Sequence, residues 1–343
     1  MTRFWLGGYS AEMQGTSTGI NTLATDESGR ASSLAVRGTA VHAQSPSWLA
    51  QHPVHDIVYA VQESSDAVTA YRRSGEDSLE QWGESIAVGH GPCHAVVAAD
   101  ASALIVSNYG DGHVVRIGIA ADGRLGRATA ASLATDPYGG GAEERQPHAH
   151  AAAFLPDGRI ATTDLGYDLV RIWRLTTAGL TIDHEVTLPR GTGPRHMVVH
   201  PSGHLHVVTE YSCEVFTLAA GRDGCWSVVA STLTTPVAVV GNDYPAELAM
   251  SRDGETLYTA LRGSNTIAAL RVRGAGETVE PVAVTDSGVD WPRHHLVHEG
   301  VLLVAGQRSD TITVIDLDSR TGVPGSIRNT IDSPTPTHFL LAR

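Results

Sequence analysis

The chain has 343 residues, of which 42% are hydrophobic and 18% charged, and its formal net charge is −13. The hydrophobic fraction excludes a disordered chain, no apolar run is long enough to span a bilayer, and the acidic balance disfavours nucleic-acid binding. The same negative charge should repel anionic substrates unless cations are gathered locally. This length allows two ordinary domains or one large β architecture.

Two features of the sequence bear on its compartment and partners. The first residues show no charged-then-apolar leader, so we expect no secretory signal. Cys93, Cys213 and Cys225 are odd in number and lack the spacing of a zinc site, which is typical of a reducing compartment. We therefore expect a cytoplasmic protein, monomeric or weakly homo-oligomeric, that binds neither membrane nor nucleic acid.

Prolines recur along the chain at spacings of 44 to 55 residues, and they mark a repeated pattern of apolar runs. Each run has four to six residues and period-2 alternation, which predicts strands rather than helices. The prolines are Pro46, Pro92, Pro147, Pro194, Pro245, Pro292 and Pro336. The first run after a proline lies at 57–61, 104–108, 160–164, 205–209, 257–261 and 302–306. The second lies at 67–71, 114–118, 169–173, 214–218, 266–270 and 311–315.

Four short antiparallel strands in each of seven repeats predict an all-β fold, a seven-bladed β-propeller, as one domain over residues 1–343. The chain begins at a second-strand equivalent, residues 4–8, and stops just after a first-strand equivalent, residues 336–341. We therefore expect both termini to complete one blade, with the C-terminal strand innermost, because this closure removes two exposed sheet edges.

Polar residues gather where chemistry is expected in such a ring. The first strand of a repeat starts, and the second ends, at the same end of the blade, so these positions converge on one mouth of the channel. Seven of the 17 histidines fall in the 21 positions after the prolines, where random placement would give about one. Arg195 and Arg293 share that column, and Glu210 and Arg262 follow or end second strands.

The segments that carry these residues resemble the bacterial lactonase propellers. The matching motifs are GHGPCH (89–94), SNYGDG (107–112), RQPHAHAA (145–152), DLGYD (164–168), GTGPRH (191–196), AELAMSRDGETLY (246–258) and LRGSN (261–265). That family includes propeller-type 6-phosphogluconolactonases and, more distantly, carboxymuconate-lactonizing enzymes. The resemblance runs over essentially the whole chain. It implies a site in the channel mouth and a mechanism without metal or other cofactor.

The resemblance also implies roles for individual residues. It gives His150, Glu210, Arg195 and Arg262 as catalytic. The residues expected to contact substrate are His94, His148, His196, Arg293, His294 and Tyr109. Two positions depart from the family pattern: Tyr211 stands where leucine is usual after the glutamate, and Leu261 stands where asparagine often precedes the arginine. Both departures leave the reactive groups in place and could alter the shape of the pocket.

Elementary chemistry leaves several assignments open. Either Glu210 or His150 can take the proton of the attacking water, while Arg195 and Arg262 meet the developing negative charge. A purely structural role for Arg195 would be an ion pair with Asp164 or Glu210. A calcium site would instead use oxygen ligands, which Glu63, Asn108, Glu210 and Glu247 would supply.

The sequence leaves three alternative functions open. The leading prediction is hydrolysis of a small anionic sugar lactone, 6-phosphogluconolactone, in the pentose phosphate pathway of carbohydrate metabolism. The alternatives are a carboxymuconate cycloisomerase that uses the same mouth, and a non-enzymatic propeller that binds a protein. Residues 136–146 lie just before a first strand and include three glycines, so we expect them to form a lid over the mouth.

Overall fold

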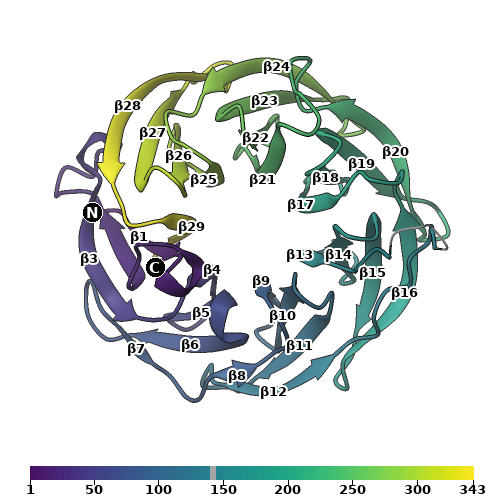
Figure 1. Cartoon of the computed structure of the whole chain (residues 1–343), viewed down its shortest axis with the longest axis horizontal. Coiled ribbons are helices and arrows are strands. Elements are labelled where there is room, and N and C mark those ends of the chain that lie inside the picture. The colour runs from purple at the N-terminus through teal and green to yellow at the C-terminus, as the bar shows by residue number, and fades with distance from the viewer. Residues whose placement is uncertain (140–143) are drawn as a thin grey trace.

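Seven antiparallel sheets stand in a ring around a central channel in the computed structural model, which describes residues 1–139 and 144–343 (Figure 1). Each sheet is a blade of four strands, and in one blade the outermost strand is split into two pieces. Three 3₁₀ helices lie in the connections, at Ala11–Met13, Ala31–Ser33 and Glu63–Ser65. Among the described residues, no helix has both the length and the apolar character to cross a membrane. The predicted seven-bladed propeller is confirmed.

The strands of each blade run outward from the channel in chain order, the termini excepted. The innermost strands are β4 (Pro46–Gln51), β9 (Pro92–Val97), β13 (Ala149–Phe154), β17 (Pro194–Val199), β21 (Tyr244–Met250), β25 (Pro292–His298) and β29 (Pro336–Leu341). The second strands are β1 (Arg3–Gly8), β5 (Ile57–Gln62), β10 (Ala103–Asn108), β14 (Ile160–Asp164), β18 (Leu205–Thr209), β22 (Thr256–Arg262) and β26 (Val301–Gly306).

The outer half of each blade is built the same way. The third strands are β2 (Gly19–Ala24), β6 (Ala67–Arg73), β11 (Val114–Ile119), β15 (Leu169–Leu175), β19 (Glu214–Ala220), β23 (Thr266–Arg273) and β27 (Thr311–Leu317). The outermost are β3 (Ala35–His42), β7 (Leu79–Gln81) with β8 (Ile86–Ala87), β12 (Leu125–Ala130), β16 (Leu180–Thr187), β20 (Trp226–Leu233), β24 (Thr278–Asp286) and β28 (Pro324–Asp332).

The repeat prolines mark the innermost strands with two small offsets. Five of them are the first residue of their strand, whereas Pro147 precedes β13 by two residues and Pro245 is the second residue of β21. Proline lacks the backbone N–H that a ladder position would donate, so the start of a strand tolerates it best.

The ring closes through a blade that both termini build. Its strands lie in the order β29-β1-β2-β3, and β29 pairs antiparallel with β1, with Phe4 opposite Leu341 and Gly7 opposite His338. In Figure 1 the yellow C-terminal strand β29 lies against the purple N-terminal strand β1. The expected closure is therefore confirmed, with the C-terminal strand innermost.

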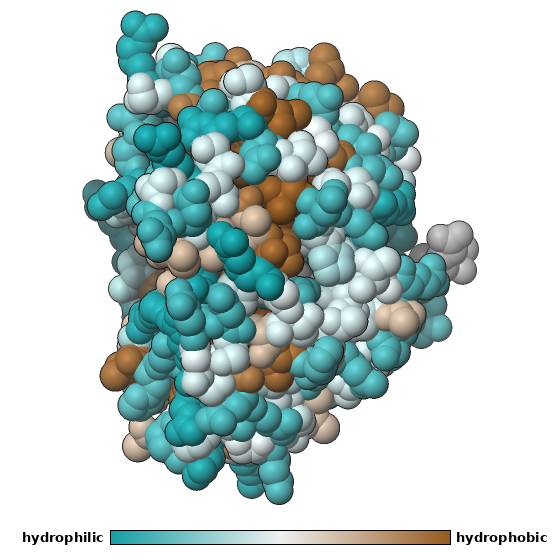
Figure 2. Space-filling model, turned by 90° about the vertical axis from the view of Figure 1, so that its left-hand side faces the viewer, coloured by the Kyte–Doolittle hydropathy of each residue, from teal (hydrophilic) through white to brown (hydrophobic). Residues whose placement is uncertain are grey.

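The core lies between the blades, because each sheet is covered on both faces. Successive residues of β5 show the principle: Ile57, Tyr59 and Val61 pack toward the β9–β12 blade, and Val58 and Ala60 pack toward the closing blade. Strands that are buried on both faces read as continuous apolar runs. The outermost strands are more exposed. In β24, exposed residues alternate with buried or partly buried ones, and the rim of the closing blade is mainly hydrophilic (Figure 2).

A core substitution should therefore weaken two blades at once. Leu104 is fully buried in the cluster that joins the β4–β7 and β9–β12 blades. We expect Leu104→Ala to lower the free energy of unfolding by about 2–5 kcal/mol, because it removes buried methyl groups and leaves a cavity. Urea unfolding followed by circular dichroism measures this. Val54→Ala is the control, since Val54 is 74% exposed and its truncation should change stability by less than about 0.5 kcal/mol.

Candidate active site

Every innermost strand carries a β-bulge at its mouth end. The register between the innermost and second strands shifts there in all seven blades, so that two residues of the innermost strand face one of its partner. Bulges of this kind re-aim side chains and are common beside active sites. The residues of the innermost strands that lie at these bulges are Ser47, Cys93, His150 with Ala151, Arg195 with His196, Ala246 with Glu247, Arg293 and Thr337.

One carboxylate in the mouth holds two arginines. Glu210, directly after β18, places Oε2 at 2.9 Å from Arg195 Nε and 2.7 Å from Arg262 Nη2. The Glu210 backbone N–H donates to Gly193 O at 2.7 Å, and Arg262 Nε donates to Tyr244 O at 3.0 Å. All three side chains are at least four-fifths buried. The sequence-predicted catalytic residues Arg195, Glu210 and Arg262 therefore form one cluster.

The charges in this cluster are strongly coupled. Burial by itself would raise the pKa of Glu210, but Arg262 and Arg195 outweigh it and hold that pKa below its ordinary value. Burial, together with the neighbouring Arg262, lowers the pKa of Arg195 to about 10. At neutral pH the cluster therefore holds one carboxylate and two guanidinium ions. The ion pair with Glu210 considered for Arg195 is present, and it lies inside the mouth rather than away from it.

A third arginine faces the same mouth from β25. Arg293 Nη1 donates to Gln307 Oε1 at 3.3 Å, and its guanidinium lies 4.9 Å from the centre of the Tyr9 ring. The Tyr9 hydroxyl in turn donates to Glu63 Oε2 at 2.9 Å. Sequence reasoning did not select Tyr9, although it directly follows β1, a second strand, and so stands in the same column of the repeat as Tyr109 and Glu210.

His150 and two tyrosines complete this side of the mouth. His150 is buried, and no hydrogen-bond partner for its Nδ1 lies among the described residues. Its ring meets the Tyr109 ring edge to face at 6.0 Å, while His148 stacks on Tyr109 at 4.3 Å. Tyr109 and Tyr211 are 37% and 38% exposed, so they form a rim.

The two departures from the family pattern have different consequences. Tyr211 packs on Gly193, where a Cβ atom would stand 2.6 Å from the Tyr211 ring and where φ is +65°, so that position requires glycine. Leu261 is buried in the cluster between the β17–β20 and β21–β24 blades and does not face the mouth. Of the two, Tyr211 is the one that shapes the pocket.

A second layer of side chains lies across the channel beneath the mouth, and we call it the histidine layer. It consists of Trp48, His94, His196, Glu247, His294 and His338. The Trp48 ring lies 3.9 to 5.5 Å from the centres of all four imidazoles. Burial lowers the pKa of each of these histidines well below its ordinary value, so they are neutral at pH 7.

The predicted substrate contacts therefore occupy two levels. Arg293, Tyr109 and His148 lie at the mouth, whereas His94, His196 and His294 lie in the histidine layer. His196 is the link between the levels, since its ring centre is 5.1 Å from that of His150. A contact with substrate remains a prediction for all of them.

Glu247 is the residue of this layer that sequence reasoning undervalued. Its Oε2 lies 2.8 Å from His196 Nδ1 and 3.6 Å from His294 Nε2. Burial raises the pKa of Glu247 to about 7, although His295 and Arg195 act in the opposite direction. Glu247 lies among the residues that follow the repeat prolines, beside the histidines, but the sequence gives no sign of this pairing and suggests Glu247 only as a calcium ligand. Among residues 1–139 and 144–343, no group of three or more metal-ligating side chains has the geometry to hold an ion.

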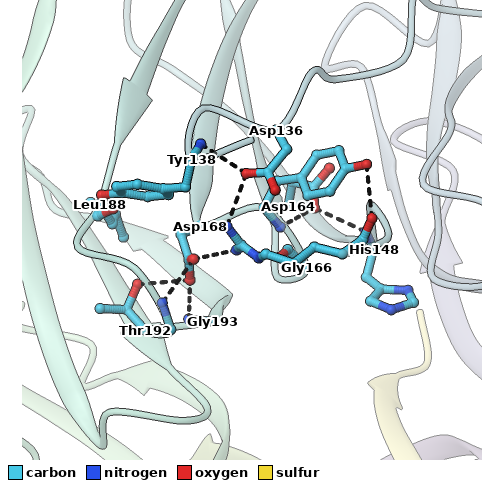
Figure 3. Close-up of polar contacts among 12 residues, drawn as sticks. Asp136, Tyr138, His148, Asp164, Gly166, Asp168, Leu188, Thr192 and Gly193 are labelled. Carbon is cyan, nitrogen blue, oxygen red and sulfur yellow. Dashed lines mark hydrogen bonds and ion pairs between the residues drawn. The ribbon is translucent and has the colours of Figure 1, made fainter. Parts of the chain in front are cut away.

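Aspartates anchor the loops around the mouth (Figure 3). Asp168 accepts hydrogen bonds from the backbone N–H groups of Gly191 and Gly193 at 2.9 and 2.8 Å. Asp164 accepts from the N–H groups of His148 and Tyr167 at 2.9 and 3.0 Å. Asp164 thus caps its own turn through Tyr167, as short Asx side chains commonly do, whereas Asp168 ties its turn to the loop that precedes β17.

The predicted lid over 136–146 includes residues 140–143, which lie outside the described residues. Its two described ends are fastened to the neighbouring loops. Arg145 pairs with Asp136 at 3.0 Å and also with Asp168, and the Tyr138 hydroxyl donates to Leu188 O at 2.7 Å. The lid itself stays a prediction.

The raised pKa of Glu247 predicts a distinctive effect of pH on stability. An unfolded glutamate has its ordinary pKa of 4.5, so between about pH 4.5 and 7 the folded protein binds a proton that the unfolded chain has lost. This contribution is fully present below pH 4.5 and is lost as pH rises through 7. Wild type should lose about 3 kcal/mol more than Glu247→Gln between pH 4.5 and 8, measured by urea unfolding at a series of pH values. Parallel curves for the two proteins would contradict the assignment.

Comparison with known proteins agrees with this architecture. A family model described as "Lactonase, 7-bladed beta-propeller" matches residues 3–341. The chain is 27% identical over 349 aligned positions to the 6-phosphogluconolactonase of Bacillus subtilis, and the match covers 98% of this chain and 97% of that one.

Solved structures show the same fold. A Lactobacillus plantarum protein has 26% identity and a TM-score of 0.87 over 99% of this chain and 100% of its own. The periplasmic gluconolactonase of Pseudomonas aeruginosa has 24% identity and a TM-score of 0.89 over 100% of this chain and 99% of its own. The arrangement of blades, the shared closing blade and the full-length match lead to one conclusion: the chain belongs to the seven-bladed β-propeller lactonase family.

Proposed function

We propose that this protein hydrolyses 6-phosphogluconolactone to 6-phosphogluconate at the channel mouth. The observation that carries the proposal is the buried cluster of Arg195, Glu210 and Arg262 beside the neutral imidazole of His150. With Arg293, this side of the mouth presents three guanidinium groups around the Glu210 carboxylate. A local excess of cations lets an acidic protein bind an anionic substrate. The name of the Bacillus subtilis relative supports the choice of lactone.

His150 is the better candidate for the general base. Burial and nearby charges lower its pKa well below the ordinary value, so the ring is neutral at physiological pH and Nδ1 can accept a proton. Glu210 is less suited, because its Oε2 is already paired with both Arg195 and Arg262. In this proposal Glu210 positions the two guanidinium groups, and we assign it no proton transfer.

In the proposed reaction, His150 takes up one proton and later returns it, so no other proton donor or acceptor is required. Water loses a proton to His150 while its oxygen bonds to the lactone carbonyl carbon, and Arg195 and Arg262 stabilise the oxyanion. When the intermediate collapses, the ring C–O bond breaks and the imidazolium of His150 returns the proton to the leaving alkoxide. The product is the open-chain acid. Arg293, paired with Gln307 in the blade next to that of Arg262, is the proposed partner of the phosphate.

Arg262 provides the direct test of the activity. Purified protein is added to 6-phosphogluconolactone generated in place, and acid release above spontaneous hydrolysis is followed. We expect Arg262→Ala to lower kcat by about 10²–10³, because a group that stabilises the oxyanion acts chiefly in the transition state. Arg222→Ala is the matched control, since Arg222 is exposed in the turn between β19 and β20 at the other end of the blade. A wild-type rate equal to background would overturn the proposal.

The identity of the base is tested by a pair of conservative substitutions. His150→Gln should lower kcat by about 10²–10⁴ with little change in KM. Glu210→Gln should keep the acid limb of the pH–rate profile, whose midpoint lies below the ordinary histidine pKa because His150 is buried. If Glu210→Gln removes that limb and His150→Gln retains it, the base is Glu210. Absorbance change with a carboxymuconate, in place of lactone hydrolysis, would instead assign the cycloisomerase reaction to the mouth.

We extend the proposal to the substrate class, the pathway, the compartment and the cofactor requirement of the reaction. The substrate is a small anionic lactone, and the reaction belongs to the pentose phosphate pathway in the cytoplasm. No metal or other cofactor takes part in the steps above. Exhaustive chelation that leaves the rate unchanged would support this part of the proposal, and loss of activity restored by a divalent cation would contradict it.

A further inference from the structure

A large cavity lies away from the mouth. It has a volume of about 920 Å³ and is lined by the far halves of the innermost strands and by the turns that follow them. These strand halves lie at the opposite end of the channel from Arg195, Glu210 and Arg262. The histidine layer stands between the two ends, since Trp48, His94, Glu247, His294 and His338 border the cavity from the mouth side.

The cavity wall has the composition of a small-molecule site. Leu49, Val97, Phe154, Leu296 and Phe339 supply apolar surface from five different blades. Pockets of this volume, with apolar walls and a few polar groups at one point, are typical of ligand-binding sites in proteins. Here the titratable groups are all at the inner end, and Gln51 is the polar side chain at the outer end.

The inner end carries one kind of charge. Among the described residues that line the cavity, Glu247 is the single acidic side chain, and no lysine or arginine borders it. The neighbouring histidines are neutral at pH 7 and offer acceptor nitrogens, and His338 Nδ1 is buried with no partner among the described residues. Asp100, exposed in the turn beside the lining residue Ala99, adds negative charge at the entrance. The surroundings therefore favour a cation over an anion.

We propose that this end of the channel is a second binding site, which takes a small amphipathic amine with its apolar body against the five blades and its ammonium group on Glu247. Such a ligand leaves no charge unpaired, because the ammonium and the Glu247 carboxylate neutralise each other within an apolar surround. It is distinct in chemistry from the mouth, where arginines predominate. The proposal does not depend on lactone hydrolysis.

Three six-carbon probes of equal length separate the contributions of shape and charge. Isothermal titration calorimetry at pH 8 measures the binding of n-hexylamine, 1-hexanol and hexanoate to the full-length protein. We expect hexylamine to bind about tenfold more tightly than hexanol, and hexanoate to bind most weakly. Equal affinities for the three probes, or no binding of any of them, would overturn the proposal.

Two substitutions locate the binding. Glu247→Gln, which is isosteric, should abolish the preference for hexylamine over hexanol, whereas the same substitution at the mouth carboxylate, Glu210→Gln, should preserve it. Ala249→Phe should weaken the binding of both probes, because Ala249 lines the cavity two residues from Glu247 and a phenyl ring there would obstruct the path to the carboxylate. Circular dichroism verifies that each variant is folded. A preference that survives Glu247→Gln, or binding that Ala249→Phe leaves unchanged, would place the amine elsewhere and contradict the proposal.

The pH dependence of binding provides an independent readout. The groups that face Glu247 are His196 and Arg195 from β17 and His294 and His295 from β25. Lowering the pH from 8 to 5.5 protonates Glu247, so the preference for hexylamine over hexanol should disappear in wild type. In Glu247→Gln the ratio of the two affinities should stay constant over the same range. A preference that persists at pH 5.5 in wild type would count against Glu247 as the partner.

Discussion

The burial of both faces of every sheet is the constraint on which this structure depends. A blade with two apolar faces is stable only with a neighbour on each side, and a row of such blades would leave two faces open. Closing the row into a ring covers them all, and the pairing of β29 with β1 makes the join. The channel exists because the seven innermost strands meet around the axis of that ring.

The bulges turn the channel into a place for chemistry. In a regular strand Arg195 and His196 would point to opposite faces, and one of them would enter the core between blades. The extra residue in the β17–β18 pairing lets both reach the channel, Arg195 toward Glu210 and His196 toward Glu247. The same device in the other blades produces two levels, a cationic mouth and the neutral histidine layer beneath it.

The two levels of the channel differ in the ionisation of their buried glutamates. At the mouth, Glu210 is outnumbered by arginines and its pKa is depressed, so it remains a carboxylate that holds them in place. In the histidine layer, Glu247 has neutral imidazoles as its nearest partners and its pKa rises toward 7. Two buried glutamates of one channel thus serve opposite purposes, and their neighbours decide which.

The sequence alone determined the seven repeats, the strands, the shared closing blade and the column of histidines, because period-2 alternation and recurrent prolines are local signals. Resemblance to a family assigned catalytic roles to Arg195, Glu210, Arg262 and His150. Only the tertiary structure decided which side chains meet. It joined Glu210 to two arginines from different blades, placed His94 and His294 below the mouth, paired Glu247 with His196, and brought Tyr9 from the shared blade to Arg293. The physical reason is that register shifts and contacts between blades depend on residues far apart in the chain, which no local pattern records.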